Sequence, residues 1–134
     1  MAATCVALVD DEASVRRALG RLLRLTGHEV LSFASGREFL DSLDGRLPDC
    51  VLLDIQMPGL NGLQVHERLK TTWPSLPVVF ITASHDPELT RHVLTGGAIG
   101  LLRKPFSRQE LLDAVASALH PVAKQFRGSR SRPD

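Results

Sequence analysis

Short apolar runs alternate with segments of helical periodicity along most of the chain. Continuous apolar runs of this kind are typical of strands that are buried on both faces of a parallel sheet. We expect five strands, at about residues 6–9, 29–33, 50–53, 78–81 and 99–102. Apolar residues at helical spacing follow each run and predict helices at about residues 15–25, 35–43, 61–72, 87–95 and 107–119. This alternation predicts an α/β domain, (βα)5, with a doubly wound, five-stranded parallel sheet and helices on both faces.

Capping residues mark the starts of four of these helices. Ser35 and Ser107 are each followed by a glutamate three residues later, which predicts two capping boxes. Asn61 and Asp86 are expected to be N-cap residues, and a proline follows Asp86 directly. The capping residues therefore agree with the helix starts that the apolar spacing predicts.

Length and charge limit the classes of function. The 134 residues, of which 43% are hydrophobic, are ordinary for one globular domain. The formal net charge is +1, but residues 121–134 hold four cations and one acid, so residues 1–120 carry −2 and we expect no direct binding of nucleic acid. No apolar run approaches the ~18 residues of a membrane span and no export signal is present, so we predict a cytoplasmic protein without membrane contact. The expected organisation is a domain at 1–120 and a basic, disordered tail or linker at 121–134.

Polar residues follow four of the predicted strands, where the carboxyl ends of parallel strands converge. They are Asp10 and Asp11 after the first strand, Asp54 after the third, Thr82 after the fourth and Lys104 after the fifth. Carboxylates at neighbouring strand ends would repel by roughly 4 kcal/mol at about 4 Å, and one lysine balances one charge at most. The remaining negative charge favours a hard divalent cation, and a ligand set made only of oxygen atoms suits Mg²⁺. A metal and a lysine beside one carboxylate suit phosphoryl transfer, with Asp54 as the nucleophile.

The other reactive side chains predict no second site. Cys5 and Cys50 open apolar runs and are expected to be buried thiols, not a disulfide or zinc ligands. The five histidines are scattered along the chain, and as a group we expect them on the surface. The helical spacing at 61–72, however, places His66 on the inner side with Leu63, Val65 and Leu69. No glycine-rich phosphate loop follows residues 6–9, which disfavours a nucleotide or flavin carrier.

Four separate motifs resemble those of one family. They are residues 6–12 (VALVDDE), 51–62 (VLLDIQMPGLNG), 80–83 (FITA) and 104–106 (KPF). Together they resemble the receiver domain of bacterial two-component response regulators over about residues 4–120, and the loop at 57–62 is most similar to that of FixJ-type regulators. The resemblance implies a flavodoxin-like sheet with strand order 2-1-3-4-5.

The resemblance also implies a role for each matching residue. Asp54 matches the phosphoacceptor, which takes the phosphoryl group from the phosphohistidine of a sensor histidine kinase or of a phosphotransfer protein. Asp11 matches a direct Mg²⁺ ligand alongside Asp54, Asp10 holds metal-bound water, and the main-chain carbonyl of Gln56 completes the metal shell, with Mn²⁺ as an expected substitute. Lys104 matches the lysine that pairs with the acceptor carboxylate and then with a phosphoryl oxygen.

Further positions concern switching. Thr82 matches the hydroxyl that moves toward the phosphoryl group, and the peptide bond before Pro105 is expected to be cis. Ser84 flanks the route of the hydrolytic water in the family and is expected to affect the lifetime of the phosphoaspartate. Leu101 departs from the family pattern, which usually has Tyr or Phe at this position. Signalling is therefore expected to rely more on movement of the helix at 87–95, helped by a hinge at Gly96 and Gly97, or on a partner that binds another face.

The predicted function is a phosphoacceptor signalling domain that takes part only in its own phosphorylation and dephosphorylation and is otherwise no enzyme. The resemblance implies that an output domain or downstream protein binds the face formed by residues 87–119, and transcription would be regulated through an output domain that this chain lacks. We expect a monomer at rest and a dimer on phosphorylation. The alternative is an interaction module that works without phosphorylation. Leu101 suggests it, because leucine lacks the aromatic ring that turns inward in the usual switch of the family.

Overall fold

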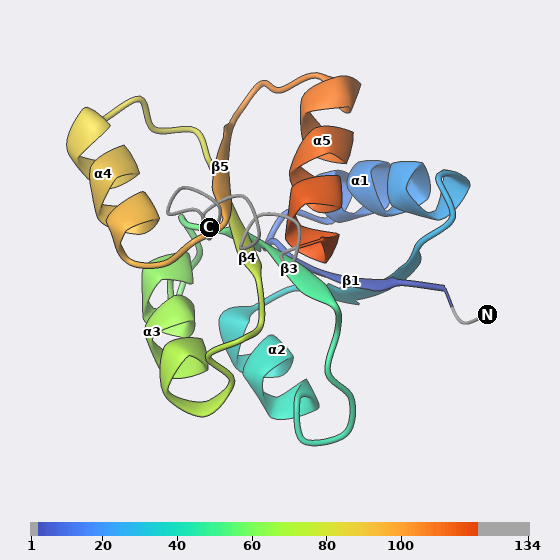
Figure 1. Cartoon of the computed structure of the whole chain (residues 1–134), viewed down its shortest axis with the longest axis horizontal. Helices are drawn as coiled ribbons and strands as arrows, with labels where there is room; N and C mark the ends of the chain where they lie inside the picture. Colours follow the sequence, from blue (N-terminus) through green and yellow to red (C-terminus); the bar gives the residue numbers. More distant parts are fainter. Residues whose placement is uncertain (1–2, 121–134) are drawn as a thin grey trace, which may run out of the picture.

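The structure is a computed structural model that describes residues 3–120. Figure 1 shows a central sheet with helices on both of its faces. The strands are β1 (Cys5–Val9), β2 (Glu29–Phe33), β3 (Cys50–Asp54), β4 (Val78–Thr82) and β5 (Gly100–Arg103). The helices are α1 (Ala13–Leu25), α2 (Gly36–Ser42), α3 (Gly62–Thr72), α4 (Pro87–Thr95) and α5 (Arg108–Leu119). The predicted (βα)5 alternation is confirmed.

The order of the strands sets the position of the functional edge. All neighbouring strands are parallel, in the order β2-β1-β3-β4-β5. The chain leaves β1 toward β2 on one side and then returns to β3 on the other side, so the winding direction reverses between β1 and β3. In sheets of this type, a crevice opens at such a reversal, beyond the carboxyl ends of the strands. The strand order that the resemblance implied is confirmed.

Two apolar clusters hold the layers together, one on each face of the sheet. Alternate residues of a strand point to opposite faces. Ala7 and Val9 of β1 therefore belong to the cluster beneath α2, α3 and α4, and Val6 and Leu8 belong to the cluster beneath α1 and α5. Figure 1 shows α1 and α5 together on one side of the sheet. Strands β1, β3 and β4 are buried along their whole length, which explains their continuous apolar sequences.

The helix caps agree with the sequence, with one difference. Asn61 and Ser107 each form a full capping box, and Asp86 accepts a hydrogen bond from the backbone N–H of Glu88. Ser35 caps α2, but the Glu38 carboxylate accepts from the backbone N–H of the residue before the cap, at 3.3 Å.

The general expectation of surface histidines is wrong for His66, whereas its predicted place on the inner side of the helix at 61–72 is confirmed. This residue lies on the inner side of α3 and is only 7% exposed. Its ring packs edge-on against Phe80, with 5.2 Å between the ring centroids. Burial lowers the pKa of His66, which keeps the imidazole neutral and compatible with the core. Cys5 and Cys50 are buried free thiols, as predicted.

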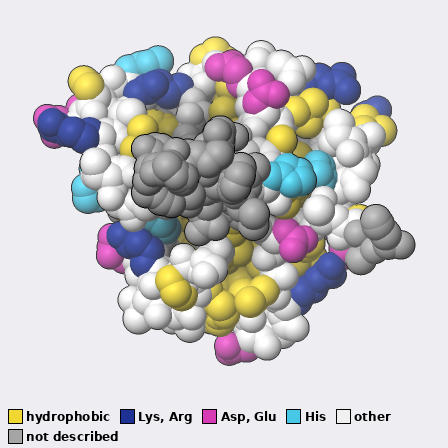
Figure 2. All heavy atoms as spheres, in the orientation of Figure 1, with side chains coloured by type: hydrophobic (Ala, Val, Ile, Leu, Met, Phe, Trp, Pro, Cys, Tyr) yellow, Lys and Arg dark blue, Asp and Glu magenta, His cyan; other side chains and the backbone are white. Residues whose placement is uncertain are grey.

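The predicted tail at 121–134 lies outside the described residues. Within residues 3–120, no helix has the length and the apolar character that a membrane crossing requires. On the face that Figure 2 shows, acidic and basic side chains of the described residues are interspersed. This face therefore presents no extended field of one sign.

Candidate functional site

The predicted site residues meet at the carboxyl edge of the sheet. Asp54 and Thr82 are the last residues of β3 and β4, Asp10 directly follows β1, and Lys104 directly follows β5. The parallel register brings these ends to the same level, because Asp54 pairs with Ile81 and Thr82 pairs with Arg103. The fold therefore converts positions spread over the whole chain into one cluster.

Three carboxylates form the centre of this cluster. One oxygen from each of Asp10, Asp11 and Asp54 lies within 4.8 Å of the others. Asp10 is fully buried; its Oδ1 accepts from the backbone N–H of Glu12 at 2.9 Å, whereas its Oδ2 has no hydrogen-bond partner among the described residues. A buried carboxylate oxygen without such a partner is costly. The oxygen-only ligand set and this unsatisfied atom fit a hard divalent cation such as Mg²⁺.

Lys104 is the cation that faces these acids. Its Nζ lies 3.5 Å from Asp10 Oδ2, 3.7 Å from Glu12 Oε1 and 3.9 Å from Asp54 Oδ1. One ammonium group is thus shared among three carboxylates, so negative charge remains in excess. The peptide bond between Lys104 and Pro105 is cis, as the resemblance implied.

Electrostatics make the charged form of Asp54 unfavourable. Its pKa is raised from 3.8 to about 7, first because burial removes water from the carboxylate and second because Asp10 lies close by. Lys104 lowers the pKa but does not compensate. Without a further cation, a substantial fraction of Asp54 therefore carries a proton near neutral pH.

Thr82 is held on the side of the site that faces away from β1. Its side chain is fully buried, and its Oγ1 donates to Gln56 Oε1 at 3.1 Å and accepts from the backbone N–H of Ser84 at 3.0 Å. An open cavity of about 600 Å³ lies over the cluster. Its lining residues are Asp11, Glu12, Asp54, Gln56, Ala83, Ser84 and Lys104. Asp54 is therefore accessible to a small group from this side.

Several contacts at the site were not predicted from the sequence. Glu12 pairs with Lys104, and Arg16 Nη1 donates to the Asp10 carbonyl at 2.7 Å. A Cβ at Gly62 would lie 2.4 Å from the Asp54 carbonyl oxygen, so only glycine lets the start of α3 approach β3 so closely. The acidic run and the turn-rich loop were visible signals for Glu12 and Gly62, but neither signal specified the contact.

Two switching candidates lie apart from the acidic cluster. Leu101 is half-buried and packs against the apolar cluster beneath α2, α3 and α4. Pro105 is exposed, and it borders a groove of about 290 Å³ between the start of α1 and the residues that follow β5. Ser84 and Gln56, in contrast, belong to the cavity over Asp54.

Comparison with known proteins settles the family. A sequence profile described as "Response regulator receiver domain" matches residues 6–116. The chain belongs to this family. Receiver domains are signalling domains of two-component systems that interact with histidine kinases and output domains. They bind Mg²⁺ through acidic residues, and in this receiver domain Asp10, Asp11 and Asp54 could hold such an ion.

Curated relatives of this receiver domain are longer proteins. Nodulation protein W of Bradyrhizobium diazoefficiens is 40% identical over 126 residues, which cover 94% of this chain and 56% of that protein. The transcriptional regulatory protein TdiR of Thauera aromatica is 39% identical over 117 residues, which cover 87% and 52%. The chain therefore spans about half the length of these relatives.

Solved structures of receiver domains superimpose on most of the chain. The chemotaxis protein CheY4 of Vibrio cholerae matches with a TM-score of 0.82 at 29% identity, covering 88% of this chain and 100% of that chain. A CheY-like receiver domain of Methanospirillum hungatei matches with a TM-score of 0.85 at 22% identity, covering 92% and 99%, and supports the fold alone.

Proposed function

We propose that this receiver domain accepts a phosphoryl group on Asp54 from the phosphohistidine of a sensor histidine kinase or phosphotransfer protein. The observation that carries this proposal is the Asp54 carboxylate, which ends β3 beside two other acids and one lysine. In the transfer, the bond between phosphorus and the imidazole nitrogen breaks, and a bond between phosphorus and an Asp54 Oδ atom forms. The imidazole leaves, and Asp54 becomes an acyl phosphate.

The metal that this chemistry needs would be held by Asp10, Asp11 and Asp54, with the main-chain carbonyl of Gln56 completing the set. Mn²⁺ would serve in place of Mg²⁺. When bound, the ion supplies neutralising charge for the phosphoryl oxygens. The Asp10 Oδ2 atom is buried without a hydrogen bond, and the one ammonium near it, that of Lys104 at 3.5 Å, is shared with Glu12 and Asp54. This supports the assignment, because a divalent cation would offset the remaining cost of desolvation.

Lys104 and Thr82 are proposed to recognise the phosphorylated state. The Lys104 ammonium lies 3.9 Å from Asp54 Oδ1, close enough to transfer its contact to a phosphoryl oxygen by a small side-chain rotation. The Thr82 hydroxyl is proposed to leave Gln56 and donate to the phosphoryl group. Gln56 and Ser84 line the cavity over Asp54, so we propose that they control access of the hydrolytic water and hence the lifetime of the phosphoaspartate.

The proposed output is a change in binding on the face formed by α4, β5 and α5. The partner would be an output domain or a downstream protein, with the chain a monomer at rest and a dimer after phosphorylation. The length of the relatives, one of them described as a transcriptional regulatory protein, supports a role in controlling transcription through an output domain. We propose residues 1–120 as the receiver domain and 121–134 as a linker or tail.

A second candidate function is an interaction module that works without phosphorylation. The observation that favours it is Leu101, a side chain half-buried against the core that cannot turn a ring between an inward and an outward position. In that case the surface at α4 and β5 would be recognised in one fixed form. The two candidates differ in whether Asp54 reacts at all.

The test is the intact mass of the protein after incubation with acetyl phosphate, with and without Mg²⁺. We expect a gain of one phosphoryl group that needs Mg²⁺, is removed by hydroxylamine and is lost in Asp54→Ala. Asp44→Asn, which changes an exposed aspartate on the loop after α2, is the matched control and should be phosphorylated normally. No gain from acetyl phosphate or from a panel of phosphorylated kinases would favour the phosphorylation-independent module.

A further inference from the structure

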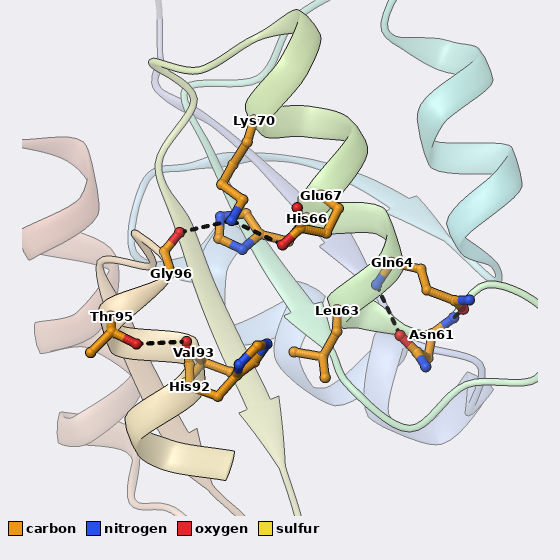
Figure 3. Close-up of a pocket in the computed structure, with 10 residues that line it drawn as sticks. All are labelled: Asn61, Leu63, Gln64, His66, Glu67, Lys70, His92, Val93, Thr95 and Gly96. Atoms are coloured by element: carbon orange, nitrogen blue, oxygen red, sulfur yellow. Dashed lines mark hydrogen bonds and ion pairs between the residues drawn. The ribbon is translucent and has the colours of Figure 1, made fainter. Parts of the chain in front are cut away.

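Helix α4 is anchored to the core less firmly than the other helices. Val93 is its only buried residue, whereas each of the other helices has at least two. Leu94 points outward and is 47% exposed. A cavity of about 390 Å³ lies between α3 and α4 (Figure 3). A segment with few buried apolar contacts moves more easily than one that is packed into the core.

Two basic side chains tie α4 to its neighbours. Arg103, the last residue of β5, donates from Nη2 to the hydroxyl of Thr90 on the second turn of α4. Lys70 of α3 donates from Nζ to the carbonyl of Gly96 at 3.2 Å, at the opposite end of α4, and Figure 3 shows its side chain crossing from α3 to this carbonyl. These contacts hold a helix whose apolar face alone gives little anchorage.

The Arg103 tie begins beside a residue of the phosphorylation site. Arg103 is the register partner of Thr82 in the parallel pair of β4 and β5, and the backbone N–H of Lys104 donates to the Thr82 carbonyl at 2.8 Å. On the other side, the Thr82 hydroxyl accepts from Ser84, whose Oγ accepts from the N-cap residue Asp86 at 3.1 Å. A displacement of Thr82 therefore acts on α4 from its N-terminal end and from β5.

We propose that Arg103 couples the phosphorylation site to α4: its hydrogen bond to Thr90 fixes the helix in the resting position, and movement of Thr82 breaks this bond and releases the helix. The inference rests on the proposed function, because it takes phosphorylation of Asp54 as the event that moves Thr82. A hydrogen bond would thus couple the phosphorylation site to α4 in this chain without an aromatic side chain in place of Leu101. Lys70 remains bonded to Gly96 and acts as the pivot.

The test compares hydrogen–deuterium exchange of the α4 amides in variants of the whole chain. Arg103→Met removes the donor and keeps an unbranched stem. Thr90→Val removes the acceptor at nearly constant shape, together with the 3.4 Å bond from the Thr90 hydroxyl to the Asp86 carbonyl. Thr95→Val is the matched control, because the Thr95 hydroxyl bonds only to carbonyls of its own helix. Arg91→Met is a second control, because the Arg91 guanidinium pairs with a glutamate of the same helix. Each protein is measured alone and with Mg²⁺ and acetyl phosphate, and its phosphorylation is measured by intact mass.

Without phosphorylation, Arg103→Met and Thr90→Val should each exchange about 2- to 10-fold faster over α4 than the natural chain, the range that one hydrogen bond supports, and the double variant should be no faster. Both controls should stay at the rate of the natural chain. Phosphorylation should raise the exchange rate of the α4 amides in the natural chain and raise it little further in Arg103→Met and Thr90→Val. Unchanged exchange in the unphosphorylated variants, or a full further increase on phosphorylation, would overturn the coupling role of Arg103. If the natural chain gains no phosphoryl mass from acetyl phosphate, phosphorylated kinases replace it as donors. A natural chain that gains no phosphoryl mass from either source would instead overturn the proposed function, and with it the release step.

Discussion

Replacing Asp54 by asparagine should stabilise the metal-free protein, although it removes the proposed acceptor. The substitution keeps the shape of the side chain and deletes one of three carboxylates whose oxygens lie within 4.8 Å of one another. At an effective dielectric constant near 20, two charges at that distance repel by about 3–4 kcal/mol. Lys104, at 3.9 Å, offsets part of this repulsion, and burial of Asp54 adds to the cost of its charge.

The raised pKa of Asp54 gives a second value for the free-energy cost of its charge in the folded protein. A pKa of about 7 in the folded protein, against 3.8 in an unfolded chain, means that ionised Asp54 destabilises the fold by about 4 kcal/mol at pH values above 7. The sign follows from the direction: the group costs nothing below pH 3.8, and stability falls as the pH rises from 3.8 through 7. At pH 5 the cost is about 1.5 kcal/mol. After allowance for relaxation, we expect Asp54→Asn to gain about 2–4 kcal/mol at pH 8 and clearly less at pH 5.

Urea unfolding in the presence of a chelator measures this gain. The free energy of unfolding is compared for the natural chain, Asp54→Asn and the exposed control Asp44→Asn at pH 8 and pH 5. Adding Mg²⁺ should then stabilise the natural chain more than Asp54→Asn, because the variant has lost one ligand and one charge. If Asp54→Asn were equally or less stable than the natural chain at pH 8 without metal, the account of the site as a cluster of uncompensated charge would be wrong.

Three further predictions follow from contacts at and near the site. Lys104→Met should lower the rate of phosphorylation by acetyl phosphate by about 100-fold, measured by intact mass over time, because a positioned charge on the phosphoryl group is lost. Gly62→Ala should destabilise the protein by about 1–3 kcal/mol in urea, because the new Cβ would meet the Asp54 carbonyl, whereas Gly100→Ala, with no atom within 4 Å of its Cβ, should change stability little. Burial lowers the pKa of His66 below its usual 6.5, so its contribution to stability is complete above pH 6.5 and is lost as the pH falls through the lower folded pKa. Urea unfolding in the Asp54→Asn background, where the opposing effect of Asp54 is absent, should therefore show a loss of stability below pH 6.5 that His66→Leu reduces.

The fold could be predicted from the sequence because strands that are buried on both faces of the sheet have a recognisable hydrophobic pattern. Strands β1, β3 and β4 are fully buried and therefore appear as unbroken apolar runs. The predicted ends of β3 and β4 were one residue too early. Asp54 and Thr82 are polar but still belong to the sheet, since Ile55 donates to the Ile81 carbonyl and Lys104 donates to the Thr82 carbonyl. Hydropathy reports the side chain, whereas the strand continues as long as the backbone pairs.

The composition of the site was predictable and its internal contacts were not. Parallel strands of similar length end at one edge, so a polar residue directly after an apolar run is placed by the topology alone. The bond from Thr82 to Gln56 and the tie from Arg103 to Thr90 depend on side-chain conformation and on how close a loop or helix comes to the sheet. For His66, residue type and helical spacing gave different predictions. Its polar type favoured the surface, but the spacing placed it on the inner side of the helix, where apolar neighbours bury it and lower its pKa.

The charges around Asp54 make phosphorylation and metal binding dependent on each other. Asp10, Asp11, Asp54 and Glu12 bring four carboxyl groups to the edge of the sheet, and Lys104 brings one positive charge. Phosphorylation would replace one carboxylate charge by a phosphoryl group of about −2. Phosphorylation therefore increases the excess of negative charge at the site. The phosphorylated chain should for this reason bind Mg²⁺ more tightly than the unmodified chain. By reciprocity of the coupling, the metal favours the phosphorylated state by the same factor. Calorimetric titration of both forms with Mg²⁺ should show a higher affinity for the phosphorylated form, and equal affinities would mean that the excess charge is relieved elsewhere.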